Sequence, residues 1–152
     1  MQTYFDYLFA RAFVTQGRDL HDFLAGSGQH LFRRAQARQV LEYLAATDRD
    51  TFRRAAAGLM ASDRIRPYLR DVVARVLQGL DAGPDDLRAV EFLMFDGAGG
   101  QARLLPLLSS AAWFDAADQA GRWEAWLAAE ATADKAGHQL HRCGAQPAPA
   151  SH

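Results

Sequence analysis

The sequence predicts an all-α protein, built from short antiparallel helices that stack side by side as a HEAT-like solenoid fragment or as an irregular helical bundle. Three observations lead to this fold class. Apolar residues recur at steps of three and four, most clearly at Ile65, Leu69, Val72, Val76 and Leu80. Glycine, proline and capping residues separate such segments at short intervals. No stretch shows the strict alternation of apolar and polar residues that is typical of a half-buried β-strand.

The first half of the chain divides into helices at recognisable stop and start signals. Gly17 readily takes the left-handed conformation that closes a helix, and Asp19 can cap the next one. Thr47 and Asp48 offer oxygen acceptors for a further helix start. Pro67 suits the beginning of a helix, where a missing amide donor matters little. The expected helices are residues 3–16, 19–24, 29–46, 48–61 and 65–80.

The second half is more interrupted. Pro84 follows Gly83 in the first-turn position of a helix expected over residues 84–95. The glycine-rich segment 96–100 is expected to break the chain, so the next helix runs from about residue 101 to 109 or 110 and is short or kinked by Pro106. A brief helix around Trp113 ends by Gly121, and a last helix runs from about residue 123 to 136.

The composition indicates one domain with a tail. A chain of 152 residues can bury about two-thirds of its unfolded surface, and 49% hydrophobic with 23% charged residues is typical of soluble globular proteins. We expect a single helical domain over residues 1–136 and a disordered tail over residues 137–152, which are rich in Gln, Pro, Ala, Ser and His. The sequence contains no apolar run of membrane-spanning length, no secretory signal and no cysteine besides Cys143. These features predict a cytoplasmic protein that does not contact a membrane.

The first eleven residues, Met-Gln-Thr-Tyr-Phe-Asp-Tyr-Leu-Phe-Ala-Arg, carry a pattern of their own. The residues that fit it are Thr3, Tyr4, Asp6, Tyr7 and Ala10. They resemble the segment H-x-[ST]-aromatic-x-[DE]-Tyr-x-x-Ala near the close of the ATPase region in NACHT- and AAA-like signal-transducing NTPases, including prokaryotic members that continue into helical repeats. Residues 30–44 and 63–73 resemble helices of that repeat region.

The resemblance implies a helical segment that follows an ATPase module, with the module itself absent from this chain. Met1 occupies the place of the family's histidine, which commonly reports on bound nucleotide, and no Walker A or Walker B group is present. We therefore expect no ATP binding or hydrolysis. The resemblance also suggests a truncated product of a bacterial defence-type protein.

Aromatic residues cover more of the first helix than one buried face requires. We expect them to contact an ATPase module or a second copy of the chain, and the candidates are Tyr4, Phe5, Phe9 and Phe13. The simpler alternative is that these residues belong to the apolar stripe of an amphipathic helix.

The middle of the chain is rich in arginine, with ten Arg against five acidic residues over positions 30–75. Arg33, Arg34 and Arg38 are the candidates for binding a partner, because guanidinium groups form bidentate contacts with phosphates and carboxylates. The alternative, which weighs more, is that these arginines lie on the solvent face and pair with nearby carboxylates. We expect no nucleic-acid binding.

No catalytic motif stands out. The segment 97–101 lacks the Lys-Ser or Lys-Thr of a phosphate-binding loop. His138, His141 and Cys143 carry donor atoms that zinc prefers, but the sequence offers no fourth ligand nearby, so we assign no metal site there. The three tryptophans suit a core or an interface better than a ligand pocket.

These observations predict a non-catalytic helical scaffold or interaction segment that needs no cofactor and binds a protein partner. The first alternative is a standalone adaptor that binds protein or nucleic acid through its arginine-rich face. The second is a metal-dependent enzyme that uses the His138, His141 and Cys143 cluster.

Overall fold

The computed structural model describes residues 3–26 and 31–143, with side chains described as far as residue 136. These residues form α-helices and one 3₁₀ helix, with no β-strand among them, which confirms the predicted all-α class. The elements are α1 (Tyr4–Thr15), α2 (Leu20–Gly26), α3 (Phe32–Thr47), α4 (Arg49–Ala61), α5 (Pro67–Gln78), α6 (Pro84–Val90), η1 (Glu91–Phe95), α7 (Gly97–Leu108), α8 (Ala111–Gln119) and α9 (Arg122–Cys143).

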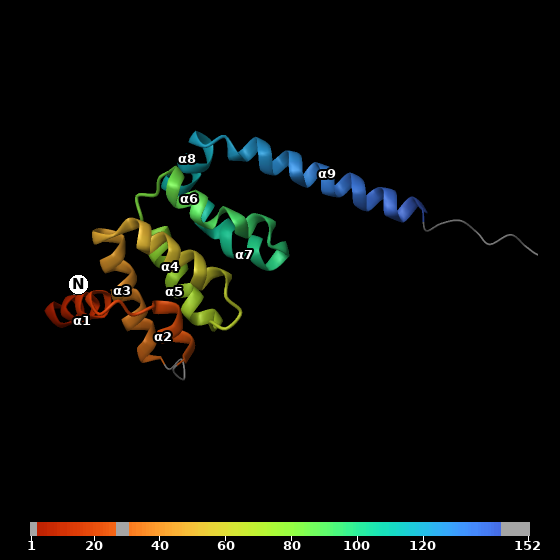
Figure 1. Ribbon diagram of the computed structural model, residues 1–152. Coiled ribbons are helices and arrows are strands. Elements are labelled where there is room, and N and C mark those ends of the chain that lie inside the picture. The colour runs from red at the N-terminus through yellow and green to blue at the C-terminus, as the bar shows by residue number, and fades with distance from the viewer. Residues whose placement is uncertain (1–2, 27–30, 144–152) are drawn as a thin grey trace, which may run out of the picture.

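The helices form two layers with the core between them (Figure 1). In one layer α1 packs on α3, α3 on α5 and α5 on α7; in the other α2 packs on α4, α4 on α6 and α6 on α8. The layers meet where α3 and α5 contact α4 and where α7 contacts α8. From α1 to α6, each helix thus packs on the one two positions along the chain, as in a solenoid of stacked helix pairs. Consequently, α1 has a neighbour in its own layer on only one side.

Several helix ends lie where the sequence predicts them. The Asp48 side chain accepts a hydrogen bond from the Thr51 amide (3.2 Å) and caps α4. Pro67 and Pro84 are the first residues of α5 and α6, where a proline needs no amide partner. Gly17 follows α1 with φ 65°, the left-handed conformation expected of it.

Two predictions in the second half are wrong in part. The single helix expected over residues 84–95 is divided, because the α-helical winding ends at Val90 and continues as the 3₁₀ helix η1. The expected break at residues 97–100 is instead the first turn of α7, since Gly97 begins the helix with φ 69°. Gly100 allows this turn to approach η1, because a Cβ at Gly100 would overlap the Leu93 carbonyl oxygen and lie 2.8 Å from the Asp96 Cβ. The glycines of this segment therefore do not interrupt the helix, and Gly100 permits close packing against η1.

The last helix, α9, continues to Cys143, seven residues beyond its expected end at about residue 136. A single glycine inside a helix costs only about 1 kcal/mol, and the alanine-rich sequence around Gly137 favours continuation. In Figure 1, α9 leaves the stack at α8 and extends away from the other helices. None of the described helices combines the length and apolar character needed to cross a membrane.

Candidate interaction surfaces

The first helix begins with a reciprocal cap. The Thr3 hydroxyl accepts a hydrogen bond from the Asp6 amide (3.3 Å), and the Asp6 carboxylate accepts one from the Thr3 amide (3.1 Å). Hydrogen bonds from Thr3 hold the pKa of Asp6 below its ordinary value. The other carboxylate oxygen of Asp6 accepts from the Gln39 side chain (2.6 Å), which ties the start of α1 to α3. The orientation of α1 on the stack is therefore fixed at its first turn.

This orientation leaves an apolar stripe of α1 uncovered. Tyr4 is 72% exposed and Phe5 is 81% exposed, and Leu8 continues the stripe one turn further. Exposed Arg11, Ala12 and Thr15 follow at the same helical spacing. We call these six residues the α1 stripe: Tyr4, Phe5, Leu8, Arg11, Ala12 and Thr15.

The structure divides the four aromatic candidates of α1 into two pairs. Phe13 is 3% exposed and belongs to the core, where its ring packs edge-on against Phe23 with the centroids 5.1 Å apart. Phe9 is half-buried and packs against the same core. The reason is geometric, because Phe9 and Phe13 lie on the face of the helix that α1 turns toward its neighbours. Of these four candidates, only Tyr4 and Phe5 have exposed side chains.

Most residues of the amino-terminal pattern have a role inside the chain. Thr3 and Asp6 form the cap, Ala10 is fully buried, and Tyr7 contacts the Tyr43 ring of α3 with the centroids 5.6 Å apart. Tyr4 is the exception, since its side chain lies in the α1 stripe. The packing of an amphipathic helix therefore accounts for the pattern except at Tyr4.

The three candidate arginines do not form one free basic patch. The Arg33 guanidinium lies 4.0 Å from the centroid of the Phe23 ring and donates a hydrogen bond to the Gln36 side chain (2.8 Å). Arg38 pairs with Glu42 at 4.0 Å, one turn along α3, as expected for arginines on a solvent face. Arg34 is half-exposed.

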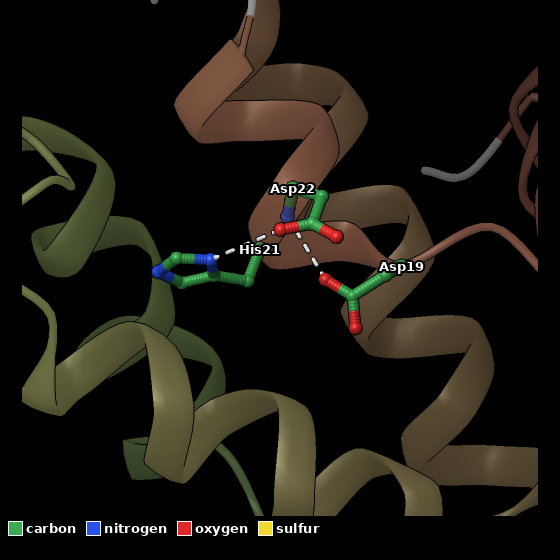
Figure 2. A group of neighbouring side chains, drawn as sticks. All are labelled: Asp19, His21 and Asp22. Atoms are coloured by element: carbon green, nitrogen blue, oxygen red, sulfur yellow. Dashed lines mark hydrogen bonds and ion pairs between the residues drawn. The ribbon is translucent and has the colours of Figure 1, made fainter.

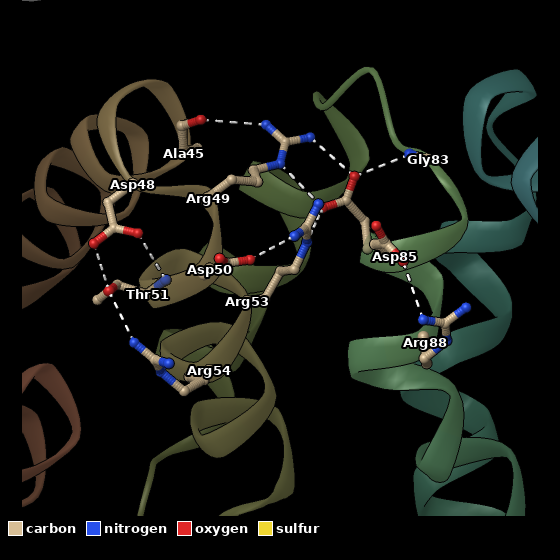
Figure 3. Close-up of polar contacts among 11 residues, drawn as sticks. Ala45, Asp48, Arg49, Asp50, Thr51, Arg53, Arg54, Gly83, Asp85 and Arg88 are labelled. Carbon is tan, nitrogen blue, oxygen red and sulfur yellow. Dashed lines mark hydrogen bonds and ion pairs between the residues drawn. The ribbon is translucent and has the colours of Figure 1, made fainter.

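A buried carboxylate in the first turn of α6 joins this helix to α4. Asp86 is 4% exposed and accepts hydrogen bonds from Arg49 Nε (3.0 Å), Arg53 Nε (2.9 Å) and the Gly83 amide (2.9 Å). Figure 3 shows Arg49, Arg53 and Gly83 around this contact. Burial by itself would raise the pKa of Asp86, but the hydrogen bonds from Arg49, Gly83 and Arg53 outweigh it and hold the pKa below its ordinary value. Because Arg49 and Arg53 of α4 both bind Asp86 of α6, this network holds the two helices together, and we call it a clamp.

A second group of polar side chains surrounds the start of α2. Asp19, His21 and Asp22 place their potential metal-ligating atoms within 4.8 Å of one another (Figure 2). The Asp19 carboxylate accepts from the Asp22 amide (2.8 Å), which confirms Asp19 as the cap, and His21 Nε2 lies 2.8 Å from Ser62 Oγ. Because Asp19 and Asp22 are exposed and one of them caps the helix, their positions are explained without an ion. The predicted metal candidates His138, His141 and Cys143 are part of α9, and only their backbone is among the described parts of the structure.

A surface hollow of about 560 Å³ lies between α1, α2, α3 and α4. Two arginines at its rim, Arg18 and Arg54, contact other residues of this chain. The Arg18 guanidinium lies 4.8 Å from the centroid of the Phe23 ring, and Arg54 donates to the Thr51 hydroxyl (3.1 Å). These contacts stabilise the α1–α2 turn and α4 rather than presenting groups to a ligand.

An apolar groove of about 440 Å³ lies at the other end of the stack, between α9 and the η1–α7 segment. Phe95, Leu105 and Leu127 are 64%, 53% and 67% exposed on its walls. Trp123 and Trp126 pack edge to face beneath it, with the ring centroids 5.3 Å apart. We call this the α9 groove and define it by Phe95, Leu105, Trp123, Trp126, Leu127 and Glu130.

Sequence analysis missed the α9 groove because its walls come from three separate elements. Trp113, the first of the three tryptophans, is fully buried, as the core interpretation requires. The indole N–H groups of Trp123 and Trp126 are covered, and neither has a hydrogen-bond partner among the residues that the structure describes. The sequence signal for the groove is an excess of apolar residues on α9, where Leu127 lies outside the face that packs on α8.

The fold and these surfaces define an all-α protein of stacked helix pairs with an uncovered apolar surface on its first helix and another beside its last. A scan against protein-family models and searches of the curated proteins and of the solved structures found no match to this chain.

Proposed function

We propose that the chain is a non-catalytic helical interaction module that binds a protein partner through the α1 stripe. The observation that carries this proposal is the exposure of Tyr4 and Phe5, whose side chains are 72% and 81% exposed on a helix whose other face packs in the core. Aromatic side chains bury large apolar areas when they are covered, so they provide much of the binding energy of protein interfaces. Contiguous exposed apolar surface marks such interfaces.

The position of α1 supports the same proposal. Helices α3 and α5 each have neighbours on two sides within their layer, whereas α1 packs in its layer on α3 alone. A further helical surface stacked on α1 would give it the second neighbour that inner helices have. The resemblance of residues 1–11 suggests that this further surface belongs to a P-loop ATPase module. The geometry of the stack is equally compatible with a second copy of the chain as the partner of α1.

Self-association tests the proposal with the chain as its own partner. We expect the average mass from light scattering to rise with protein concentration, and Phe5→Asp to lower the apparent association constant by at least about tenfold, as for the loss of an aromatic hot spot. Phe32→Asp is the matched control, because Phe32 is 86% exposed but lies on α3, outside the α1 stripe. Circular dichroism checks that each variant remains folded.

A wild-type chain that stays monomeric up to about 1 mM would exclude a second copy of the chain as the partner, since even an association free energy of about −4 kcal/mol is visible there. Equal loss of association in the Phe5 and Phe32 variants would overturn the proposal, because the effect would then not belong to the α1 stripe.

A further inference from the structure

We infer that the α1 stripe of one copy docks in the α9 groove of a second copy, so that the chain associates head to tail. This inference rests on the proposed function and names the surface that receives α1. The helices that carry these two surfaces lie at opposite ends of the stack, α1 at one end and α9 at the other (Figure 1). One copy therefore offers both surfaces at the same time.

The α9 groove is open because α9 diverges from the helices beside it. The ion pair between Arg122 and Glu91 (3.0 Å) fixes the start of α9 against η1, and Trp126 is 6% exposed. From Leu127 to Ala136 every residue is exposed, so this part of α9 and the side of α7 that carries Leu105 face one another without filling the space between them.

The size of the groove suits a helix such as α1. The part of α9 that lines the groove, from Trp123 to Ala133, is about 16 Å long, and α1 is about 18 Å long, at the rise of an α-helix. The exposed aromatic rings of Tyr4 and Phe5 can cover Phe95, Leu105 and Leu127, which are the exposed apolar residues of the groove. Covering both surfaces removes apolar area from water on each side of the contact.

Charge favours the groove over a second α1 as the receiving surface. Residues 1–75 carry 12 basic and 8 acidic side chains, and residues 76–152 carry 5 basic and 10 acidic ones, so the half containing α1 is positive and the half containing α9 is negative. Within the two surfaces the charged residues are Arg11 and Glu130. Neither forms an ion pair with another residue in the described part of the chain. The nearest carboxylate on α1, that of Asp6, is engaged by Thr3 and Gln39.

The spacing of these residues gives a register. Leu8 and Arg11 are one turn apart on α1, and Leu127 and Glu130 are one turn apart on α9. When Leu8 lies against Leu127 with the two helices parallel, Arg11 lies beside Glu130. Because the two surfaces differ and are carried by helices at opposite ends of the stack, the contact is heterologous and continues from copy to copy instead of closing as a symmetric dimer.

Complementation between two variants tests the inference. Phe5→Asp disrupts the α1 stripe and leaves the groove, whereas Leu127→Asp disrupts the groove and leaves the stripe. Each variant alone is expected to be monomeric in light scattering, and an equimolar mixture is expected to show twice the monomer mass, because one intact stripe and one intact groove remain. Leu105→Asp provides a second groove variant on a different helix, and Phe32→Asp again serves as the control.

Charge reversal tests the register. Arg11→Glu and Glu130→Arg are each expected to weaken association about threefold to fivefold, the range for an exposed ion pair, and combining both changes in one chain should restore it. Failure of the double variant to recover would overturn the register and with it the proposed orientation.

The outcomes separate this inference from the proposed function. If Phe5→Asp abolishes association while Leu127→Asp and Leu105→Asp leave it unchanged, α1 binds a surface other than the groove; the inference then fails and the proposed function stands. A monomeric wild type overturns the inference and excludes a second copy as the partner of the α1 stripe. Association that Phe5→Asp leaves unchanged overturns both the inference and the proposed function.

Discussion

The indole Nε1 of Trp113 donates a hydrogen bond of 2.7 Å to the carbonyl oxygen of Leu77. Trp113 is fully buried on α8, and Leu77 is in the last turn of α5, where backbone carbonyls lack partners within the helix. A single side chain thus fills the core between the two layers and satisfies a helix end 36 residues earlier in the chain.

Substitution of Trp113 by phenylalanine should lower the free energy of unfolding by about 2 kcal/mol, because it removes this hydrogen bond and leaves a small cavity. Urea denaturation of the monomeric chain measures the change. Trp126→Phe is the matched control, since the Trp126 indole N–H has no hydrogen-bond partner among the described residues. An equal loss in both variants would show that the hydrogen bond to Leu77 contributes nothing measurable.

Substitution of Asp86 by alanine should destabilise the chain by about 3 kcal/mol, because Arg49 and Arg53 would lose the buried carboxylate that holds them. Asp85→Ala is the neighbouring control, with an effect within about 1 kcal/mol, since its pair with Arg88 is exposed.

The contribution of Asp86 should also depend on pH. Its pKa in the folded chain is held below the unfolded value of about 3.9, so the stabilisation is fully present above about pH 5 and is lost as the pH falls through the folded pKa. The difference in unfolding free energy between wild type and Asp86→Ala should therefore stay constant from pH 7 to about pH 5 and shrink below it. A difference that grows on acidification would contradict the charged clamp.

Substitution of Gly100 by alanine should destabilise the chain by about 1–3 kcal/mol, because the added methyl group would press against the Leu93 carbonyl and the Asp96 side chain. Gly99→Ala is the control on the adjacent residue, where a Cβ meets no atom within 4 Å. It should stabilise the chain by about 0.5–1 kcal/mol, as alanine does in a helix interior. Thermal unfolding of the two variants distinguishes these opposite signs, and two shifts of the same sign would refute the close contact.

The sequence by itself determined the features that depend on neighbouring residues. Asp48 and Pro84 mark helix starts and Gly17 marks a helix end, because capping and φ preferences act within one turn. The recurrence of apolar residues at three and four positions likewise predicted the all-α class.

Tertiary structure alone decided which of these local features are buried and which remain exposed to a partner. Phe5 and Phe13 are both aromatic residues of α1, yet one is 81% exposed and the other 3%, because the rotation of α1 on α3 is set partly by the Asp6–Gln39 contact across 33 residues of sequence. Asp86 is a buried clamp rather than a surface carboxylate because Arg49 and Arg53, on α4, converge on it. Gly100 lies where η1 comes so close that a side chain would not fit. Each outcome depends on contacts between elements, which local sequence patterns do not encode.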